Sequence, residues 1–344
     1  MKLTLIVFVM TCLSMVAQAE DQPWVTFEGK EGAGKGKHIV FVTGDDEYLS
    51  EDSMPVMAKI LSDKHGFKCT VLFAINKTTG VIDTNTKDNI PGLEALDTAD
   101  LMVLFTRFRA LPDDQMKHII DYVDSGRPVI GLRTATHAFN YGKEETSYKK
   151  YTWTSREPGF DGGFGRLVLG ETWINHFGHH GHESTRGIVA PGAAGNPILR
   201  GIKDGDIWGP TDVYEVRMPF PSENKPLILG QVLTGMNPTD PPLPPPDIQK
   251  TKVLDKNNPM LPVAWTRTYT GAQGKPSRVF TSTMCGSMSG KRDLDSEGLR
   301  RLIVNACYWC VGLENKIPEK SDVDLVLKFG VFKRGIKPKD AVVQ

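Results

Sequence analysis

The sequence has no excess of charge of either sign and no long apolar run after its first residues. Lys plus Arg and Asp plus Glu both number 41 in 344 residues, the formal net charge is +0, and no basic block stands out. This balance argues against nucleic acid as a partner. Beyond the N-terminal segment no stretch is long and apolar enough to span a bilayer, so we expect a mature chain without a membrane span.

Several catalytic motifs are also missing. The chain contains no G-x-S-x-G, G-x-G-x-x-G, P-loop or H-E-x-x-H pattern. The usual support for a serine hydrolase, for dinucleotide or nucleotide binding and for a zinc protease is therefore absent. The turn after the strand predicted at 128–132 contains Arg133 and Thr134 but no Cys. Because Thr134 has no adjacent base, the sequence does not favour covalent catalysis.

Cysteine is scarce, with five in the whole chain. Cys307 and Cys310 form a C-x-x-C inside the apolar helical pattern of residues 297–311, whereas a redox C-x-x-C belongs at the start of a helix. Two Cys three residues apart within a helix are also poorly placed to bond to each other. Disulfides are possible in an exported protein, but we predict buried free thiols here.

The N-terminus is typical of an export signal. Lys2 precedes an apolar run from residue 3 to 16, and Ala17-Gln18-Ala19 has the small-x-small pattern of a signal peptidase site. The sequence before Cys12 is a poor lipobox. We expect a signal peptide over residues 1–19, with an uncleaved anchor as the alternative, and a periplasmic or extracellular protein.

The first half of the chain alternates between strand and helix patterns. Apolar runs that end at Gly or Arg indicate strands buried on both faces, and stripes at helical spacing lie between them. This alternation predicts an α/β fold with a doubly wound parallel sheet, for which a flavodoxin-like strand order is the natural expectation. The predicted strands are 38–43, 67–74, 100–105 and 128–132, and the predicted helices are 50–64, 92–96 and one that starts near Pro112.

The second half shows shorter strand patterns before a closing helix. We expect the Pro-rich stretch within 235–259 to be a solvent loop, because strand patterns resume directly after it. The predicted organisation is a leader at 20–36, one elaborated α/β domain at 37–313 and a C-terminal tail at 314–344 that wraps the surface or is partly loose. The strands expected in this half are 188–189, 213–216, 227–232, 262–266 and 279–283, and the closing helix is 297–311.

Polar residues follow three of the predicted parallel strands. Because ligands bind at the carboxyl ends of strands in open α/β sheets, we expect these residues to converge on one rim and to bind a substrate. The alternative is that the acidic residues only cap a helix and pair with Arg107 or Arg109. The predicted substrate-binding residues of these loops are Asp45, Asp46, Glu47, Tyr48, Arg107, Arg133, Thr134 and His137.

Four histidines within seven residues form the densest chemical signal. His176, His179, His180 and His182 are followed by Glu183. Neutral imidazole binds zinc, copper, nickel or iron, so all four are candidate metal ligands and a divalent metal is a possible cofactor. The same residues could instead act as acid and base or bind substrate, as we predict for His179, or could form a plain polar loop, which the two Gly in the segment favour.

An ordered set of segments resembles the ThuA-like (trehalose-utilisation) family across residues 37–313. The segments are 41–48, 129–137, 162–176, 211–214, 262–265 and 278–283. The resemblance implies a class I glutamine-amidotransferase-like, flavodoxin-type fold without the amidotransferase Cys-His pair, and a role in sugar catabolism. His176 and Asp212 match the family pattern, whereas Arg133 and Ser287 stand where family members commonly carry histidine.

These patterns together predict an exported protein that acts on a carbohydrate or keto-sugar. One His of the cluster would be the general acid or base, with His176, His180 and Asp212 as the expected catalytic residues. Arg107 and Arg133 would stabilise negative charge that develops on a substrate oxygen. The alternatives are a non-catalytic sugar-binding or partner-binding protein and a metal-dependent hydrolase that uses the His cluster.

Overall fold

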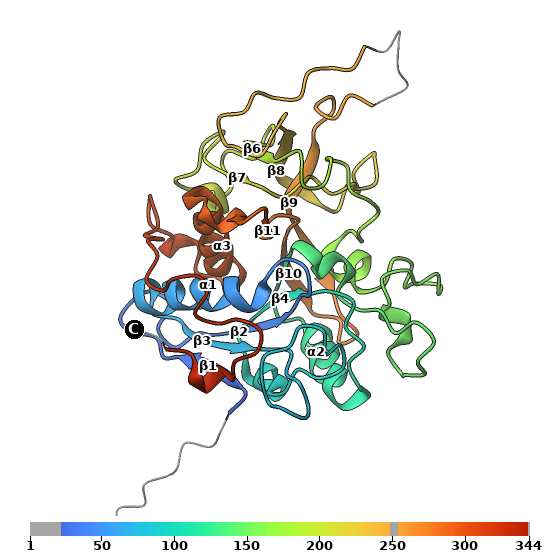
Figure 1. The fold of residues 1–344 in the computed structure, drawn as a ribbon, viewed down its shortest axis with the longest axis vertical. Helices are drawn as coiled ribbons and strands as arrows, with labels where there is room; N and C mark the ends of the chain where they lie inside the picture. The colour runs from blue at the N-terminus through green and yellow to red at the C-terminus, as the bar shows by residue number, and fades with distance from the viewer. Residues whose placement is uncertain (1–21, 248–253, 343–344) are drawn as a thin grey trace, which may run out of the picture.

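The computed structural model describes residues 22–247 and 254–342. Their main feature is one mixed sheet of ten strands (Figure 1). Five neighbouring strands run parallel, in the order β3-β2-β4-β5-β10. The predicted α/β class is confirmed. The bounds of these strands are His38–Gly44 for β2, Lys68–Leu72 for β3, Leu101–Thr106 for β4, Val129–Leu132 for β5 and Pro276–Ser282 for β10.

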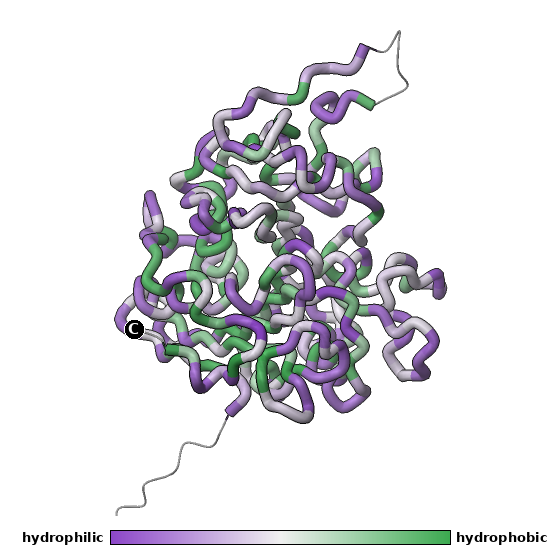
Figure 2. The backbone as a smooth tube through the Cα atoms, in the orientation of Figure 1, coloured by the Kyte–Doolittle hydropathy of each residue, from purple (hydrophilic) through white to green (hydrophobic). Residues whose placement is uncertain are grey.

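The parallel strands β2, β4 and β5 are mostly apolar because both of their faces are covered. In β2, Ile39 and Phe41 belong to one core cluster while Val40 and Val42 belong to the other. Alternate side chains of a strand point to opposite faces, so one continuous apolar run supplies two cores. Figure 2 shows green, hydrophobic backbone in the lower half of the molecule, where Figure 1 labels β2, β3 and β4.

Helices cover the two faces of the parallel sheet. Side chains of α1 (Ser50–His65) and α3 (Glu297–Cys310) pack in one core cluster, and those of α2 (Asp113–Asp124) and the 3-10 helix η1 (Leu93–Thr98) pack in the other. Gly66 ends α1 at a φ of 81°, and the Ser296 hydroxyl accepts a hydrogen bond from the Leu299 amide at the start of α3. The helix predicted at 92–96 corresponds to η1, which is a 3-10 helix.

The second half of the chain extends the sheet with antiparallel strands. Beyond β10 the order is β9-β8-β6-β7, and a separate ribbon pairs β11 with β12. The strand predicted at 213–216 is wrong, because among these residues only Tyr214 forms a bridge, to His176. These strands are β6 Thr185–Val189, β7 Trp208–Gly209, β8 Lys225–Val232, β9 Leu261–Thr270, β11 Ser287–Met288 and β12 Lys291–Arg292.

Short helical turns connect these elements. One of them, η2, follows β5 directly, and another, η4, is a single π-helical turn. Their bounds are η2 Arg133–His137, η3 Lys149–Tyr151, η4 Gly165–Leu169, η5 Pro197–Leu199, η6 Asp293–Asp295, η7 Glu314–Lys316 and η8 Pro338–Asp340.

The segment predicted as a loose leader contains a strand. In β1 (Trp24–Phe27) every residue pairs antiparallel with β3, from Trp24 opposite Leu72 to Phe27 opposite Cys69. Without β1, strand β3 would be an edge with unpaired backbone groups. At the other end of the chain the tail packs back on the protein, where Phe332 is buried and stacks on Phe73 with ring centroids 5.6 Å apart.

The predicted buried thiols are confirmed. Cys69, Cys285, Cys307 and Cys310 are all buried and free. Within the described residues, no helix has the length and apolarity needed to cross a membrane. The predicted signal peptide over residues 1–19 lies outside the described residues. So do residues 248–253 of the Pro-rich stretch, of which the described part is mostly exposed.

Candidate functional site

The loop after β2 is organised by a buried carboxylate. Asp45 accepts hydrogen bonds from the backbone amides of Glu47 (2.7 Å) and Tyr48, and the Thr134 hydroxyl of η2 also donates to it. The Ser50 hydroxyl accepts the amides of residues 44 and 45 rather than capping α1. Asp45 and Thr134 are fully buried, so their contacts favour a structural role that joins two rim loops.

The neighbouring acidic residues form an ion-pair cluster at the rim. Asp46 lies 2.7 Å from Lys87 Nζ, 3.3 Å from Arg107 and 3.5 Å from the buried Arg109. Glu47 pairs with Arg107 at 2.9 Å. Asp46 therefore pairs with Arg107 and Arg109, as the alternative to substrate binding predicted. Glu47 remains about a third exposed, and its other oxygen faces the His cluster.

Arg133 lies at the centre of the site but is closed off from solvent. It is fully buried, and its backbone, directly after β5, has a φ of 44°, which is uncommon for a residue with a side chain. The guanidinium is held between the rings of Tyr48 and Tyr214, at 4.6 and 3.7 Å from their centroids. It donates to the Tyr48 hydroxyl (3.0 Å) and to the Thr283 carbonyl (2.8 Å).

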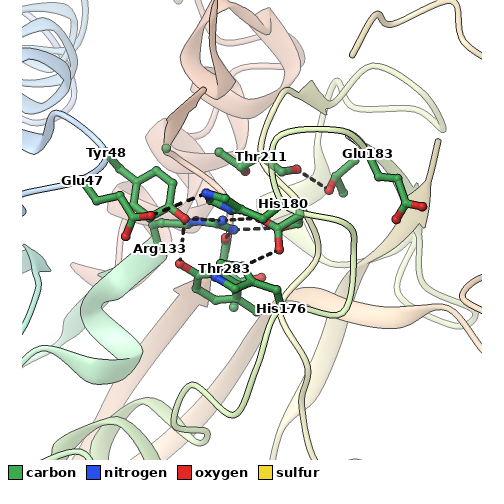
Figure 3. A network of polar contacts seen from close by, with 12 residues as sticks. Glu47, Tyr48, Arg133, His176, His180, Glu183, Thr211 and Thr283 are labelled. Atoms are coloured by element: carbon green, nitrogen blue, oxygen red, sulfur yellow. Dashed lines mark hydrogen bonds and ion pairs between the residues drawn. The ribbon is translucent and has the colours of Figure 1, made fainter. Parts of the chain in front are cut away.

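The guanidinium of Arg133 also fixes Asp212. It donates to the Asp212 carbonyl at 2.8 Å and to its carboxylate Oδ1 at 3.0 Å. These contacts do not favour the predicted role of Arg133 at a substrate oxygen. They favour a positioning role, in which the cation holds a buried carboxylate in place (Figure 3).

Asp212 binds two histidines at once. His176 Nδ1 lies 2.8 Å from its Oδ2, and His180 Nδ1 lies 3.0 Å from its Oδ1. Burial alone would raise the pKa of Asp212, but Arg133 and the two histidines outweigh burial and hold this pKa below its usual range. An ionised carboxylate only accepts hydrogen bonds, so we assign the proton of each imidazole to Nδ1, which leaves both Nε2 atoms free to accept a proton.

Neighbouring contacts fix the segment that carries Asp212. The Thr211 hydroxyl and amide both donate to the buried Asp293, at 2.6 and 3.2 Å. On the other side, His176 bridges to Tyr214, and the amides of Phe177 and Gly178 donate to the Val213 carbonyl. Two segments that are distant in the sequence thus hold the carboxylate and the imidazoles together.

Gly178 permits the close approach of the histidine loop. A Cβ atom at this position would lie 2.9 Å from Asp212 Cβ and 3.2 Å from the amide nitrogen of Val213. Any side chain at Gly178 would therefore displace the loop or Asp212. The two imidazole rings lie 4.5 Å apart, each about a third exposed, and His180 Nε2 is 3.6 Å from Glu47 Oε1. The pair is thus accessible from solvent.

The other two histidines of the cluster lie outside this group. His179 and His182 stack on each other with ring centroids 4.3 Å apart, and both are exposed. Glu183 accepts the His179 amide at 2.7 Å and pairs with Lys256 at 2.7 Å. The predicted four-histidine metal set is therefore corrected to two histidines, joined by Asp212.

An aromatic wall adjoins the histidine pair. The Trp173 ring lies 5.6 Å from that of His176, 5.4 Å from His137 and 5.6 Å from Trp153. Trp153 and Trp173 also line a pocket of about 340 Å³ with Arg166, and the buried indole nitrogen of Trp173 has no hydrogen-bond partner. Sequence reasoning missed these tryptophans as site residues, although Trp173 directly precedes the histidine cluster.

His137 lies behind the aromatic wall rather than at the rim surface. Its side chain is buried against Phe108 and Trp173. Burial, followed by the nearby cations Arg107 and Arg133, lowers the pKa of His137 well below its usual value. His137 is therefore neutral near pH 7, and its contacts favour support of the wall over direct substrate binding.

Comparison with known proteins gives likenesses in structure alone. No protein-family model and no curated protein matches the chain. A ThuA-like protein from Parabacteroides merdae ATCC 43184 is similar at 13% identity and a TM-score of 0.49, over 80% of this chain and 90% of that one. A second, from Bacteroides uniformis ATCC 8492, is similar at 12% identity and a TM-score of 0.48, over 82% of this chain and 94% of that one. Both of these structural neighbours are ThuA-like proteins.

The two ThuA-like neighbours bear the family name that the sequence segments suggested. At 12% and 13% identity they do not indicate which residues of this chain act, or on what. The roles of His176, His180 and Asp212 therefore depend on their own geometry.

Proposed function

We propose that this chain is an exported ThuA-like enzyme that converts a carbohydrate or keto-sugar by acid/base chemistry at the sheet rim. The observation that carries this proposal is the sharing of one buried carboxylate, Asp212, by His176 and His180. A carboxylate that holds Nδ1–H fixes the orientation of an imidazole and leaves Nε2 to take or give a proton. Each such imidazole is a base, and once it has taken a proton from the substrate it becomes the acid that can return one.

The remaining charges suit a substrate that gains negative charge on oxygen. Arg107 lies at the rim, about a quarter exposed, and contacts Glu47, which in turn faces His180 Nε2 at 3.6 Å. Removal of a proton from a carbon next to a carbonyl places charge on that oxygen, which a nearby cation stabilises. We assign this task to Arg107 in place of the enclosed Arg133.

The aromatic pocket supports a carbohydrate as the substrate class. A sugar ring has one face of C–H groups, which packs on an aromatic ring, and hydroxyl groups at its edge, which need polar partners. Trp153 and Trp173 provide such faces, while Arg166 and Thr172 provide polar atoms in the same pocket. Its volume of about 340 Å³ is at the lower end of the range typical of small-molecule sites.

The strand order supports the finer assignment of the fold. Numbered along the chain, the five parallel strands lie in the order 2-1-3-4-5, which is the flavodoxin-like order. The site lies at the carboxyl ends of β2 and β5, where ligands bind in such sheets. We propose on this basis the glutamine-amidotransferase-like variant of the fold, with the antiparallel strands as its elaboration.

A ligand screen with product detection tests the proposed function. Mono-, di- and 3-keto-sugars are added to the purified mature protein, and both the melting temperature and the products after long incubation are recorded. A ligand that binds only the folded state must raise the melting temperature. We expect at least one sugar to stabilise the protein and to be converted. Binding confirmed by calorimetry, with no product from any sugar, would instead identify a sugar-binding protein.

A further inference from the structure

His176, His180 and Asp212 form a group with the composition of a transition-metal site. One nitrogen or oxygen atom from each of the three lies within 4.8 Å of the others, in the part of the chain that the structure describes. Two imidazoles with one carboxylate suit zinc, copper, nickel, cobalt or iron, whereas calcium and magnesium prefer ligand sets made of oxygen. The group therefore selects a class of ion as well as a place for it.

We propose that His176, His180 and Asp212 bind one divalent transition-metal ion, of which Zn²⁺ is the representative. The proposal concerns binding alone and is independent of the proposed sugar activity, whose unprotonated Nε2 atoms belong to the metal-free form. A neutral imidazole carries one proton on either nitrogen, so ligation through Nδ1 moves that proton to Nε2 without a change in charge. The ion then occupies the space in which Asp212 otherwise accepts the two imidazole protons.

The observed distances are close to those that an ion requires. Ligand atoms around a tetrahedral zinc with bonds of about 2.0–2.1 Å lie about 3.3 Å apart. The contacts from Asp212 Oδ2 to His176 Nδ1 and from Asp212 Oδ1 to His180 Nδ1 are 2.8 and 3.0 Å, so each imidazole would have to move outward by a few tenths of an ångström. The ion would take both carboxylate oxygens, or the carboxylate would turn to offer one of them to the ion that both histidines bind. Three protein ligands leave at least one position open, and both imidazoles are about a third exposed, so water can reach that position.

The surroundings hold the ligands in place but limit the affinity. The carboxylate of Asp212 is fixed by Arg133 at 3.0 Å, and Gly178 lets the histidine loop pack directly on it. The Arg133 cation opposes a second positive charge beside it, while Glu47, 3.6 Å from His180 Nε2, favours one. We therefore expect binding in the micromolar range rather than the far tighter binding of structural zinc sites.

Zinc titration of protein made without a histidine tag tests this site. The protein is stripped with a chelator, and Zn²⁺ is titrated against a chromophoric competitor. We expect one ion per chain, and we expect His176→Gln and His180→Gln to weaken binding by about 100-fold or more, because each removes a direct ligand. The matched controls are His179→Gln and His182→Gln, which change the same loop at an exposed pair outside the group. These controls are expected to bind as the wild type does.

Two results would overturn the proposal. One is the absence of Zn²⁺ binding to the wild type up to about 1 mM. The other is binding that is lost in the His179 and His182 variants but kept in the His176 and His180 variants. Should the His176 or the His180 variant fail to fold, Co²⁺ added to the wild type tests the site instead. A tetrahedral Co²⁺ with imidazole ligands absorbs visible light much more strongly than free Co²⁺ at the same concentration, and the absence of this increase would contradict the site.

Discussion

At the scale of single residues, buried charges determine how this site is held together. Asp212 and Arg133 both have fully buried side chains and lie 3.0 Å apart. Taking two charges out of water costs free energy, which each partner offsets only while the other is present. Asp212 therefore has two roles: it orients His176 and His180, and it offsets the cost of burying the Arg133 cation.

Substitution Asp212→Asn tests this double role. The amide keeps the shape of the carboxylate but leaves the buried Arg133 cation without its counter-charge, so we expect a loss of about 3 kcal/mol in the free energy of unfolding. Urea unfolding measures it. The control is Asp322→Asn, the same change at the exposed pair with Lys64, which we expect to cost less than about 1 kcal/mol. Equal costs for the two variants would contradict the account.

A second buried acid predicts how stability depends on pH. Burial raises the pKa of Glu51 from 4.5 to about 7, and Arg334, 3.2 Å away, offsets only part of this effect. The folded state then binds a proton that the unfolded state has released between about pH 4.5 and 7. Stability that is present below pH 4.5 is therefore lost as pH rises to 7, by up to about 3 kcal/mol from this group.

The variant Glu51→Gln removes this titration. Urea unfolding of the variant and the wild type at several values between pH 4.5 and 7.5 measures it. We expect the difference in stability to move in favour of the variant as pH rises over this range. A difference that stays constant with pH would show that Glu51 does not titrate in this way.

At the scale of elements, the histidine loop depends on one glycine. In Gly178→Ala the added Cβ meets Asp212 Cβ at 2.9 Å, so the loop must move away and the two imidazoles lose their shared carboxylate. We expect at least about a tenfold loss of sugar turnover, since small misplacements at a reacting site are costly. Gly195→Ala is the control, because nothing lies within 4 Å of its added Cβ. Wild-type turnover in Gly178→Ala would contradict this placement of the loop.

Strand β1 gives a further prediction at this scale. Phe27 is buried in the core cluster shared with α1, whereas the neighbouring Thr26 is exposed. Phe27→Ala is expected to cost about 3–5 kcal/mol in the free energy of unfolding, because it removes a buried aromatic side chain and leaves a cavity. Thr26→Ala in the same strand is the control, with an expected cost below about 1 kcal/mol. Similar small effects of both changes would mean that β1 does not pack on the core.

Some elements could be predicted from the sequence, and physical reasons explain the others. The strands that became β2, β4 and β5 are continuous apolar runs because both of their faces are covered, and this pattern is local in the sequence. Strand β1 was missed because its four residues lie among polar and Gly-rich neighbours, and its pairing with β3 depends on a contact more than forty residues away. Three of the four residues in the segment 213–216 are hydrophobic because they are buried, but the segment makes one bridge only.

At the scale of the whole molecule, the site is a product of long-range packing. The rim loops and the histidine cluster could be predicted because their polar residues follow predicted strands or crowd together in sequence. The sharing of Asp212 by His176 and His180 could not, since it joins segments more than thirty residues apart. Nor could the enclosure of Arg133 between Tyr48 and Tyr214, which depends on three separate segments. Arg133 and Ser287, where the resemblance predicts histidine, both contact Tyr48: the Arg133 guanidinium lies over its ring, and the Ser287 hydroxyl lies 3.4 Å from its carbonyl oxygen.

The turnover of one sugar by matched histidine variants tests the central claim most directly. With the sugar that the screen identifies, kcat is measured for the wild type, His176→Gln, His180→Gln and His182→Gln. Loss of an acid or base typically costs about 10²–10⁴-fold, so we expect at least about a hundredfold fall in kcat for the first two variants and none for His182→Gln. Unchanged turnover in both His176→Gln and His180→Gln would contradict the proposed site.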